Sequence, residues 1–219
     1  MNQETLYHRQ LDIIPLAQLQ KAKITVIGAG AVGSFTAFTL AKMGIGSLTV
    51  YDDDVVTEHN LPNQLFRVSD IGKKKVVALA EIIEDFHGVR IEAIPLKYIN
   101  QKLSDIVIVT VDSMDTRIAI WEHICYDPSI KLFIDSRMGA EVSRVISINP
   151  IDPTEISFYE STLHTSQEAL PVRCTEKTVI YTVLGIASFI SGKVKKYLTS
   201  QAFNRSITMD YRQSVLLHQ

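Results

Sequence analysis

The sequence of 219 residues predicts an α/β fold with a doubly wound, mainly parallel sheet. Short apolar and β-branched runs alternate with longer segments of helical spacing, which is the order expected of β-α-β units. The run over residues 106–111 is almost continuously apolar, as in a strand that is covered on both faces. A glycine-rich turn between the first such run and the first helical segment completes a Rossmann-like pattern.

The elements in the first two thirds of the chain follow in a regular order. Residues 1–22 form a mixed polar and apolar arm that is helical from about Pro15. Predicted strands cover residues 23–27, 48–51, 89–95, 106–111 and 132–134, and predicted helices cover residues 34–43, about 69–86 and 116–126. Right-handed crossovers bring the carboxyl ends of these strands to one edge of the sheet, where such folds bind ligands.

The pattern changes after Gly139. Residues 141–148 alternate between apolar and polar, which indicates an antiparallel strand with one solvent-facing side. Residues 149–178 hold three prolines and many serines and threonines, so we expect a crossover loop there. A helix over 178–198 and a last strand within 206–216 complete a single domain, divided into an N-terminal arm (1–22), a βα core (23–135) and a C-terminal part (136–219).

The composition excludes several classes of protein. A formal charge of −2 and 46% apolar residues are typical of a soluble globular protein and provide no basic field for nucleic acid. The longest apolar stretch, residues 179–190, is too short to cross a bilayer. Two cysteines without a C-x-x-C pair argue against a disulfide framework and a four-cysteine zinc site. No secretory signal opens the sequence. Together, these observations predict a cytoplasmic protein with neither nucleic acid nor membrane partners.

The turn between the first predicted strand and helix carries a phosphate-binding pattern. Gly28, Gly30 and Gly33 have the spacing G-x-G-x-x-G, which permits a tight turn and a close approach of backbone to phosphate at a helix start. Asp52 ends the second strand, where a carboxylate accepts hydrogen bonds from ribose hydroxyls. We therefore expect a bound nucleotide. The alternative is that the glycines serve only helix–strand packing.

A polar cluster follows the second strand. It contains side chains able to hold a polyphosphate, namely Asn60, Asn63, Gln64, Arg67 and Lys75. Three consecutive lysines, residues 73–75, are expected in the first turn of a helix, where positive charge opposes the helix dipole by roughly 0.3–1 kcal/mol each. A bound polyanion would reverse that sign, whereas the alternative interpretation is a solvated charged turn.

Motifs in the same order and spacing over about residues 5–148 resemble the ThiF/MoeB/HesA superfamily. They are Y-H-R-Q at 7–10, L-x-x-A-K-I-T-V-I-G-A-G-A-V-G-S at 19–34, G-I-G-S-L-T-V-Y-D-D-D at 44–54, N-L-P-N-Q at 60–64, G-K-K-K at 72–75 and V-D-S-M-D-T-R at 111–117. These adenylating enzymes serve thiamine and molybdopterin biosynthesis and are related to ubiquitin-activating enzymes. The resemblance implies an adenylyltransferase that uses ATP and Mg²⁺. Such an enzyme joins AMP to the C-terminal carboxylate of a small ubiquitin-like or sulfur-carrier protein ending in Gly-Gly, and it releases pyrophosphate.

The resemblance also implies roles for the nucleotide-binding residues. Gly30 would approach the nucleotide, and Asp52 would hold the ribose, with Asp54 beside it. Asn60 and Gln64 would line the phosphates, and Lys75 would contact them.

Two further roles concern the metal and the assembly. Asp112 would take the Mg²⁺ ion, with Ser113 beside it in the nucleotide site. From the residues alone, the alternative is that Asp112 caps a helix that starts near Asp115, and the two roles are compatible. Arg9 matches an arginine that the superfamily sends across a two-fold interface into the partner's site, which implies a homodimer.

The sequence departs from the superfamily at one phosphate-binding position. The usual motif is N-L-x-R-Q, and Asn63 stands where the arginine is expected. Either Arg67, about one helical turn further on, supplies the missing charge, or the enzyme is slow, or it has lost adenylation. Of these we favour substitution by Arg67.

Cys174 lies in the expected crossover loop, where some members of the superfamily carry a cysteine that takes the activated carboxylate. The basic neighbours Arg173 and Lys177 favour a thiolate, and the alternative is an inert small residue. Cys125 is expected in the core.

Two other functions are weighed against adenylation. A non-catalytic partner subunit or scaffold of the same fold is kept open by Asn63. An NAD-dependent oxidoreductase would share the glycine turn and Asp52, but would also need a hydride-handling acid and a nicotinamide pocket, which the sequence does not display.

Overall fold

The computed structural model describes residues 3–103, 105–164 and 178–219. Within them, one sheet of eight strands has the order β3-β2-β1-β4-β5-β6-β7-β8. The strands are β1 (Lys23–Ile27), β2 (Ser47–Tyr51), β3 (Glu92–Ile94), β4 (Asp105–Val109), β5 (Ile130–Gly139), β6 (Val142–Ile148), β7 (Ser206–Asp210) and β8 (Val215–His218). The first five pair in parallel and the last three pair antiparallel, which confirms the predicted fold class.

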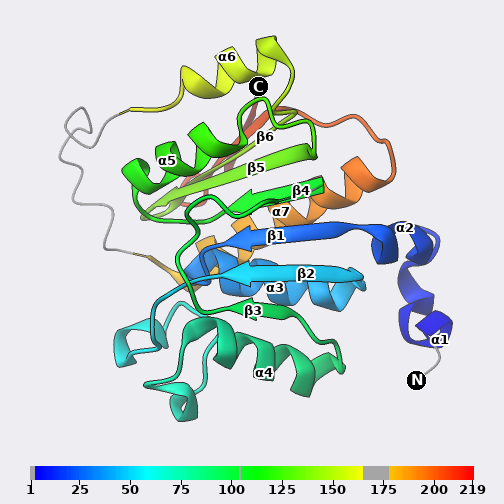
Figure 1. The fold of residues 1–219 in the computed structure, drawn as a ribbon, viewed down its shortest axis with the longest axis vertical. Coiled ribbons are helices and arrows are strands. Elements are labelled where there is room, and N and C mark those ends of the chain that lie inside the picture. The colour runs from blue at the N-terminus through cyan, green and yellow to red at the C-terminus, as the bar shows by residue number, and fades with distance from the viewer. Residues whose placement is uncertain (1–2, 104, 165–177) are drawn as a thin grey trace.

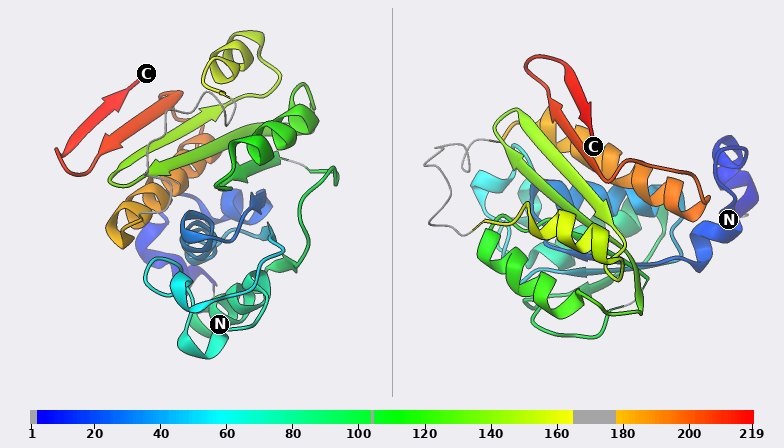
Figure 2. Two further views of the ribbon diagram at one scale, coloured as in Figure 1. Left: turned by 90° about the vertical axis from the view of Figure 1, so that its left-hand side faces the viewer. Right: turned by 90° about the horizontal axis from the view of Figure 1, so that it is seen from above.

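Helices cover both faces of this sheet (Figures 1 and 2). One face carries α3 (Ala31–Met43), α4 (Lys75–His87) and α7 (Ile180–Leu198), and the other carries α5 (Met114–Ile124) and α6 (Pro153–Glu160). Strand β4 contributes side chains to the hydrophobic core on each face of the sheet. Ile106 and Ile108 pack with the first set of helices, whereas Val107 and Val109 pack with the second. This two-sided burial explains the continuous apolar run in the sequence.

The N-terminal arm folds against the amino ends of the strands. It consists of α1 (Gln3–Tyr7), the 3₁₀ turn η1 (His8–Gln10) and α2 (Leu16–Lys21). The Tyr7 hydroxyl lies 2.8 Å from Nε2 of His87, and Gln10 Nε2 donates to the carbonyl of Met43 at 2.6 Å. Leu19 is fully buried. The arm is thus fixed at the end of the sheet opposite the carboxyl ends of β1, β2 and β4 (Figure 1).

Helix α4 begins later than the sequence pattern predicts. Residues 68–70 form the 3₁₀ turn η3 (Val68–Asp70), and Gly72 adopts a φ of +88°, which interrupts any helix there. Lys74 is the N-cap residue and Lys75 is the first helical residue. Of the three lysines, only Lys75 therefore lies within the helix.

The C-terminal part contains more regular structure than predicted. Residues 153–160, expected to be loop, form α6, because Asp152 Oδ1 accepts hydrogen bonds from the N–H groups of Thr154 and Glu155 and Pro153 occupies the first turn. The expected single last strand is a hairpin, β7–β8, in which β8 forms an exposed edge of the sheet (Figure 2).

The boundary expected at residues 135/136 falls inside β5, so one sheet joins the βα core to the C-terminal part. None of the helices in the described residues combines the length and the hydropathy needed to cross a membrane.

Candidate active site

The glycine turn follows β1 at its carboxyl end. Gly28 has a φ of +99°, in the left-handed region that favours glycine. A Cβ on Gly33 would lie 1.9 Å from the carbonyl oxygen of Gly28, so the turn and the start of α3 meet too closely for any other residue. A Cβ on Gly30 would meet no atom within 4 Å. Two of the glycines therefore close the turn, and Gly30 leaves the backbone open to a ligand.

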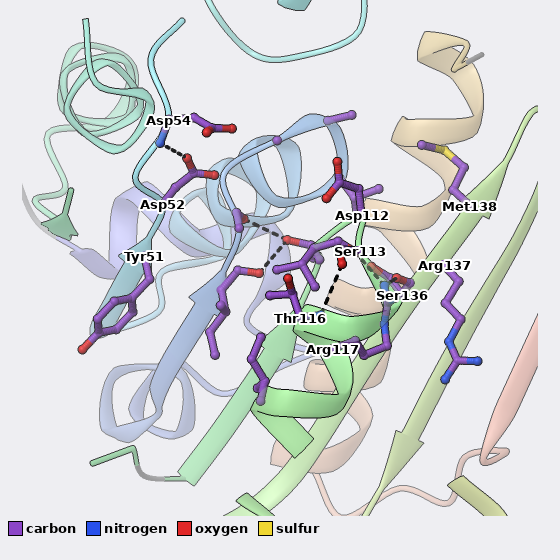
Figure 3. A pocket seen from close by; sticks show the side chains of 18 of the residues that line it. Tyr51, Asp52, Asp54, Asp112, Ser113, Thr116, Arg117, Ser136, Arg137 and Met138 are labelled. Atoms are coloured by element: carbon purple, nitrogen blue, oxygen red, sulfur yellow. Dashed lines mark hydrogen bonds between the residues drawn. The ribbon is translucent and has the colours of Figure 1, made fainter. Parts of the chain in front are cut away.

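Asp52 follows β2 and reaches the glycine turn. Its Oδ2 accepts a hydrogen bond from the N–H of Ala29 at 2.7 Å. Its Oδ1 accepts one from the N–H of Asp54 at 2.9 Å (Figure 3). Desolvation raises the pKa of Asp52, although these hydrogen bonds and the positive charge of Lys75 oppose the shift. The carboxylate is thus held in place beside the turn.

Lys75 brings a nearly buried ammonium group to the same place. Its side chain is 8% exposed, and its Nζ donates to Oδ2 of Asp54 at 2.7 Å. The neighbouring lysines are used elsewhere: Lys73 pairs with Glu81 at 2.6 Å, and Lys74 donates to the carbonyl of Asp53. Only one of the three lysines therefore faces the site.

Asp112 and Ser113 follow β4. The hydroxyl of Ser113 accepts a hydrogen bond from the N–H of Thr116 at 3.3 Å and caps α5, so the capping alternative for Asp112 is wrong. Asp112 is exposed, and its carboxylate has no hydrogen bond or ion pair within the part of the chain that the structure describes. A carboxylate of this kind suits a divalent cation that also binds substrate phosphates.

These residues surround a cavity of about 980 Å³ at the carboxyl ends of the strands (Figure 3). The residues named from the sequence that border it are Gly28, Gly30, Asp52, Asp54, Asn63, Gln64, Lys75, Asp112 and Ser113. Oδ1 of Asn63 and Oε1 of Gln64 are buried and have no hydrogen-bond partner among the described residues. The cavity thus presents unsatisfied polar atoms, which a polar ligand would satisfy.

Three of the residues expected to bind the nucleotide do not border the cavity, namely Gly33, Asn60 and Arg67. Gly33 serves the local packing described above. Asn60 is 5% exposed, and its Oδ1 accepts hydrogen bonds from the N–H and the hydroxyl of Thr57 at 2.9 and 2.8 Å. The side-chain oxygen of Asn60, expected to line the phosphates, thus closes a turn outside the cavity lining.

Arg67 is held by carboxylates on the outside of this region. It pairs with Asp70 at 3.0 Å, with Asp85 at 2.8 Å and with Glu81 at 3.4 Å. The guanidinium of Arg67, expected to replace the missing phosphate-binding arginine, is thus directed to these three acids, and Arg67 does not border the cavity.

Arg9 is exposed within η1, at the opposite end of the sheet from the cavity (Figure 1). Cys174 lies outside the described residues. Cys125 is partly buried against the core beneath α5, where desolvation raises its pKa. Among the described residues, no group of three or more His, Cys, Asp or Glu side chains is arranged to hold a metal ion.

A buried charge cluster, which the sequence pattern does not predict, lies on the cavity wall. Asp135 is fully buried and pairs with Nε of Arg117 at 2.5 Å and with Nε of Arg137 at 2.8 Å. Both arginines border the cavity. The available signal was Arg117 itself, in the motif V-D-S-M-D-T-R, because a charged residue on the buried face of a helix needs a partner.

The comparisons with known proteins agree with this architecture. A model of the ThiF family matches residues 7–214. The chain belongs to the ThiF family.

Two curated relatives match parts of the chain. The tRNA threonylcarbamoyladenosine dehydratase of Haemophilus influenzae is 35% identical over 154 residues, which cover 64% of this chain and 54% of the relative. The probable adenylyltransferase/sulfurtransferase MoeZ of Mycobacterium tuberculosis is 39% identical over 67 residues, or 30% of this chain and 17% of MoeZ. The chain thus spans about half or less of the length of these ThiF-family relatives.

Solved structures share the fold. PaaA aligns with a TM-score of 0.77 and 18% identity, covering 99% of this chain and 73% of PaaA. Escherichia coli MccB, in a crystal structure with ATP, aligns with a TM-score of 0.72 and 18% identity, covering 93% of this chain and 65% of MccB.

Proposed function

We propose that this ThiF-family protein adenylates a carboxylate, using ATP and releasing pyrophosphate. One observation carries the proposal: Gly30, Asp52, Lys75 and Asp112, which follow or begin four different elements, border one cavity. A nicotinamide-binding site would use Gly30 and Asp52, but it has no need of a buried lysine beside the phosphates or of an unpaired carboxylate. The crystal structure of MccB with ATP, which has the same fold, adds support.

Different residues of the site are suited to bind different parts of ATP. Asp52 is suited to accept hydrogen bonds from the ribose hydroxyls, and Lys75 supplies a positive charge for the phosphates. Gln64 and Asn63 present amide groups to the same space. Asp112 fits a divalent cation, and a Mg²⁺ ion bound there would neutralise charge on the phosphate oxygens.

The reaction needs no general base. The attacking carboxylate is already ionised at neutral pH. One of its oxygens forms a bond to the α-phosphorus, the bond from that phosphorus to the oxygen bridging to the β-phosphorus breaks, and pyrophosphate leaves with the electron pair. Catalysis then consists of positioning the two reactants and stabilising charge, and Lys75 is the protein group best placed for the second task.

As the acceptor we propose the C-terminal carboxylate of a small ubiquitin-like or sulfur-carrier protein ending in Gly-Gly. The combined activities in the name of the relative MoeZ, adenylyltransferase and sulfurtransferase, favour this class. The tRNA dehydratase relative favours a second candidate, a carboxylate on a modified tRNA base, because its match covers 64% of this chain. The formal charge of −2 gives this chain no general attraction for RNA.

The test is ATP–pyrophosphate exchange with the purified protein. Exchange that depends on a Gly-Gly carrier protein supports the proposal, and exchange that depends only on tRNA supports the second candidate. Absence of exchange, together with tight binding to a second activating subunit, would instead identify a non-catalytic partner, the alternative kept open by Asn63. Binding of NAD without exchange would identify an oxidoreductase.

Two parts of the proposal concern assembly and a later step. We propose a cytoplasmic homodimer in which Arg9 of each copy enters the other copy's site. We also propose that Cys174 takes the activated carboxylate after adenylation. Cys174→Ala is then expected to retain exchange and to lose the covalent adduct in mass spectrometry, and loss of exchange as well would assign the cysteine a structural role.

A further inference from the structure

The buried cluster around Asp135 joins two segments that the proposed reaction uses. Asp135 lies in β5 and is fully buried, so its charge must be compensated within the protein. Two guanidinium groups share it: Arg117 of α5 bonds Oδ1 and Arg137 of β5 bonds Oδ2. The hydroxyl of Tyr159 in α6 donates to the same Oδ2 at 3.2 Å.

Arg117 connects this carboxylate to the turn that carries Asp112. Its Nη2 donates to the carbonyl of Val111 at 2.6 Å and to the carbonyl of Ser136 at 3.0 Å. The first of these carbonyls directly precedes Asp112. Arg117 therefore ties the end of β4 to β5, and the position of the Asp112 backbone depends on it.

Arg137 connects the same carboxylate to the chain that follows α6. Its Nη1 donates to the carbonyl of Thr162 at 2.6 Å and its Nη2 to the hydroxyl of Thr162 at 3.0 Å. Its guanidinium also lies 5.6 Å from the ring centre of Tyr159. Figure 3 shows the Arg137 side chain running away from Asp112, so its partners differ from those of the nucleotide site. His164, two residues after Thr162, borders the cavity.

We propose that Asp135 is a positioning residue which, through Arg117 and Arg137, fixes the Asp112 turn and the Thr162 segment relative to each other. One buried carboxylate then sets both the metal-binding side of the cavity and the wall at His164. This inference rests on the proposed function for the role of Asp112. The Asp135 contacts themselves do not depend on it.

The test measures metal binding and hydrogen exchange in Arg117→Gln, Arg137→Gln and Asp135→Asn. The probe is α,β-methylene ATP, whose α–β link cannot be cleaved, titrated with Mg²⁺. We expect Arg117→Gln to raise the apparent Kd for Mg²⁺ about ten-fold, as is usual for loss of a group that orients a metal ligand. Arg137→Gln is expected to change it less than about two-fold. Asp135→Asn is expected to raise it as Arg117→Gln does.

Amide exchange supplies the second readout. In the wild-type protein, Mg²⁺ with the nucleotide analogue is expected to protect peptides covering residues 111–117 and 158–164. Arg137→Gln should lose only the second protection, and Asp135→Asn should lose both. Arg90→Gln is the matched control, because Arg90 makes an exposed pair with Glu84 far from the cluster.

The proposal is overturned if Arg117→Gln leaves the Mg²⁺ Kd unchanged or if Arg137→Gln keeps the second protection. It is equally overturned if all three variants weaken both readouts in proportion to their loss of Tm, since that is the result of a structural role alone. Arg117→Lys and Arg137→Lys replace any variant that does not fold. If the wild type binds no nucleotide, the proposed function fails. Amide hydrogen exchange of the two peptides in the ligand-free variants then still tests whether Asp135 connects the two segments.

Discussion

Lys75 and Asp54 form an ion pair of 2.7 Å at the start of α4, with the lysine side chain almost buried and the aspartate largely exposed. The pair directs one ammonium group along the cavity wall while the two preceding lysines point elsewhere. This difference between adjacent residues gives the most direct test of the site.

We expect Lys75→Gln to lower ATP–pyrophosphate exchange by about 100-fold or more, since a charge aimed at the reacting phosphates acts in the transition state. Lys74→Gln, one residue away and exposed, is the control and is expected to stay within about two-fold of wild type. Steady-state exchange rates measure both. Equal effects of the two variants would remove Lys75 from its assigned role.

The missing phosphate-binding arginine gives a second test. Because Arg67 is engaged by three carboxylates, Arg67→Gln is expected to lower the melting temperature and to leave exchange within about two-fold. Asn63→Arg, which restores a cation at the cavity, is expected to raise exchange about ten-fold. A folded Arg67→Gln variant without exchange would show that Arg67 reaches the phosphates.

The position of Arg9 leads to a complementation experiment. Arg9 belongs to η1, between α1 and α2, and this arm lies at the amino ends of the strands, opposite the cavity of its own copy (Figure 1). Arg9→Ala and Asp112→Ala are each expected to be inactive alone and to regain about a quarter to a half of wild-type exchange when co-purified as a mixed dimer. Full activity of Arg9→Ala on its own, or failure of the mixture, would argue against a shared site.

Substitutions in the glycine turn can distinguish a structural role from a role in nucleotide binding. Gly33→Ala places a Cβ against the Gly28 carbonyl and is expected to cost roughly 1–3 kcal/mol of unfolding free energy, or to prevent folding. Gly30→Ala has open space around its Cβ and is expected to fold normally and to weaken ATP binding. Urea unfolding and calorimetric titration distinguish the two. If both variants bind the nucleotide as tightly as wild type, the turn has no contact with the ligand.

The lowered pKa of Asp70 leads to a prediction of how the stability of the protein changes in acid. Its burial alone raises its pKa, but hydrogen bonds from Arg67 and Lys73 outweigh this and lower the pKa below its ordinary value. The ionised form therefore stabilises the folded state above the unfolded pKa of about 3.9, and this contribution is lost as pH falls through the lower folded value. Wild type should lose stability more steeply than Asp70→Asn below about pH 4. Parallel unfolding curves from pH 6 to pH 3 would contradict this.

The sequence predicted the elements whose pattern is local and repetitive. β1 and β4 are apolar on both faces, and α3 follows directly on the glycine turn, so their positions agree with the structure to within a few residues. The cavity was also predictable in part, because parallel strands bring Asp52 and Asp112 to one edge however they are ordered.

The remaining features depend on contacts between distant residues. Arg117 and Asp135 are 18 residues apart, and although a buried arginine needs a partner, no local pattern identifies Asp135 as that partner. The ion pairs of Arg67 with Glu81 and Asp85 depend on where α4 begins. Gly72 and the turn before it move that beginning to a later residue than the pattern predicts. The helix α6 was predictable from Asp152 followed by Pro153, but its short apolar face gave little further signal.

Helix capping and the proposed cation ligand fall to adjacent residues, Ser113 and Asp112. Each can therefore be altered without disturbing the other. An amide in place of the Asp112 carboxylate would leave the beginning of α5 intact, and alanine at Ser113 would loosen the helix start while retaining the acid. A homologue that had kept only the serine would preserve this architecture and lack the proposed cation ligand.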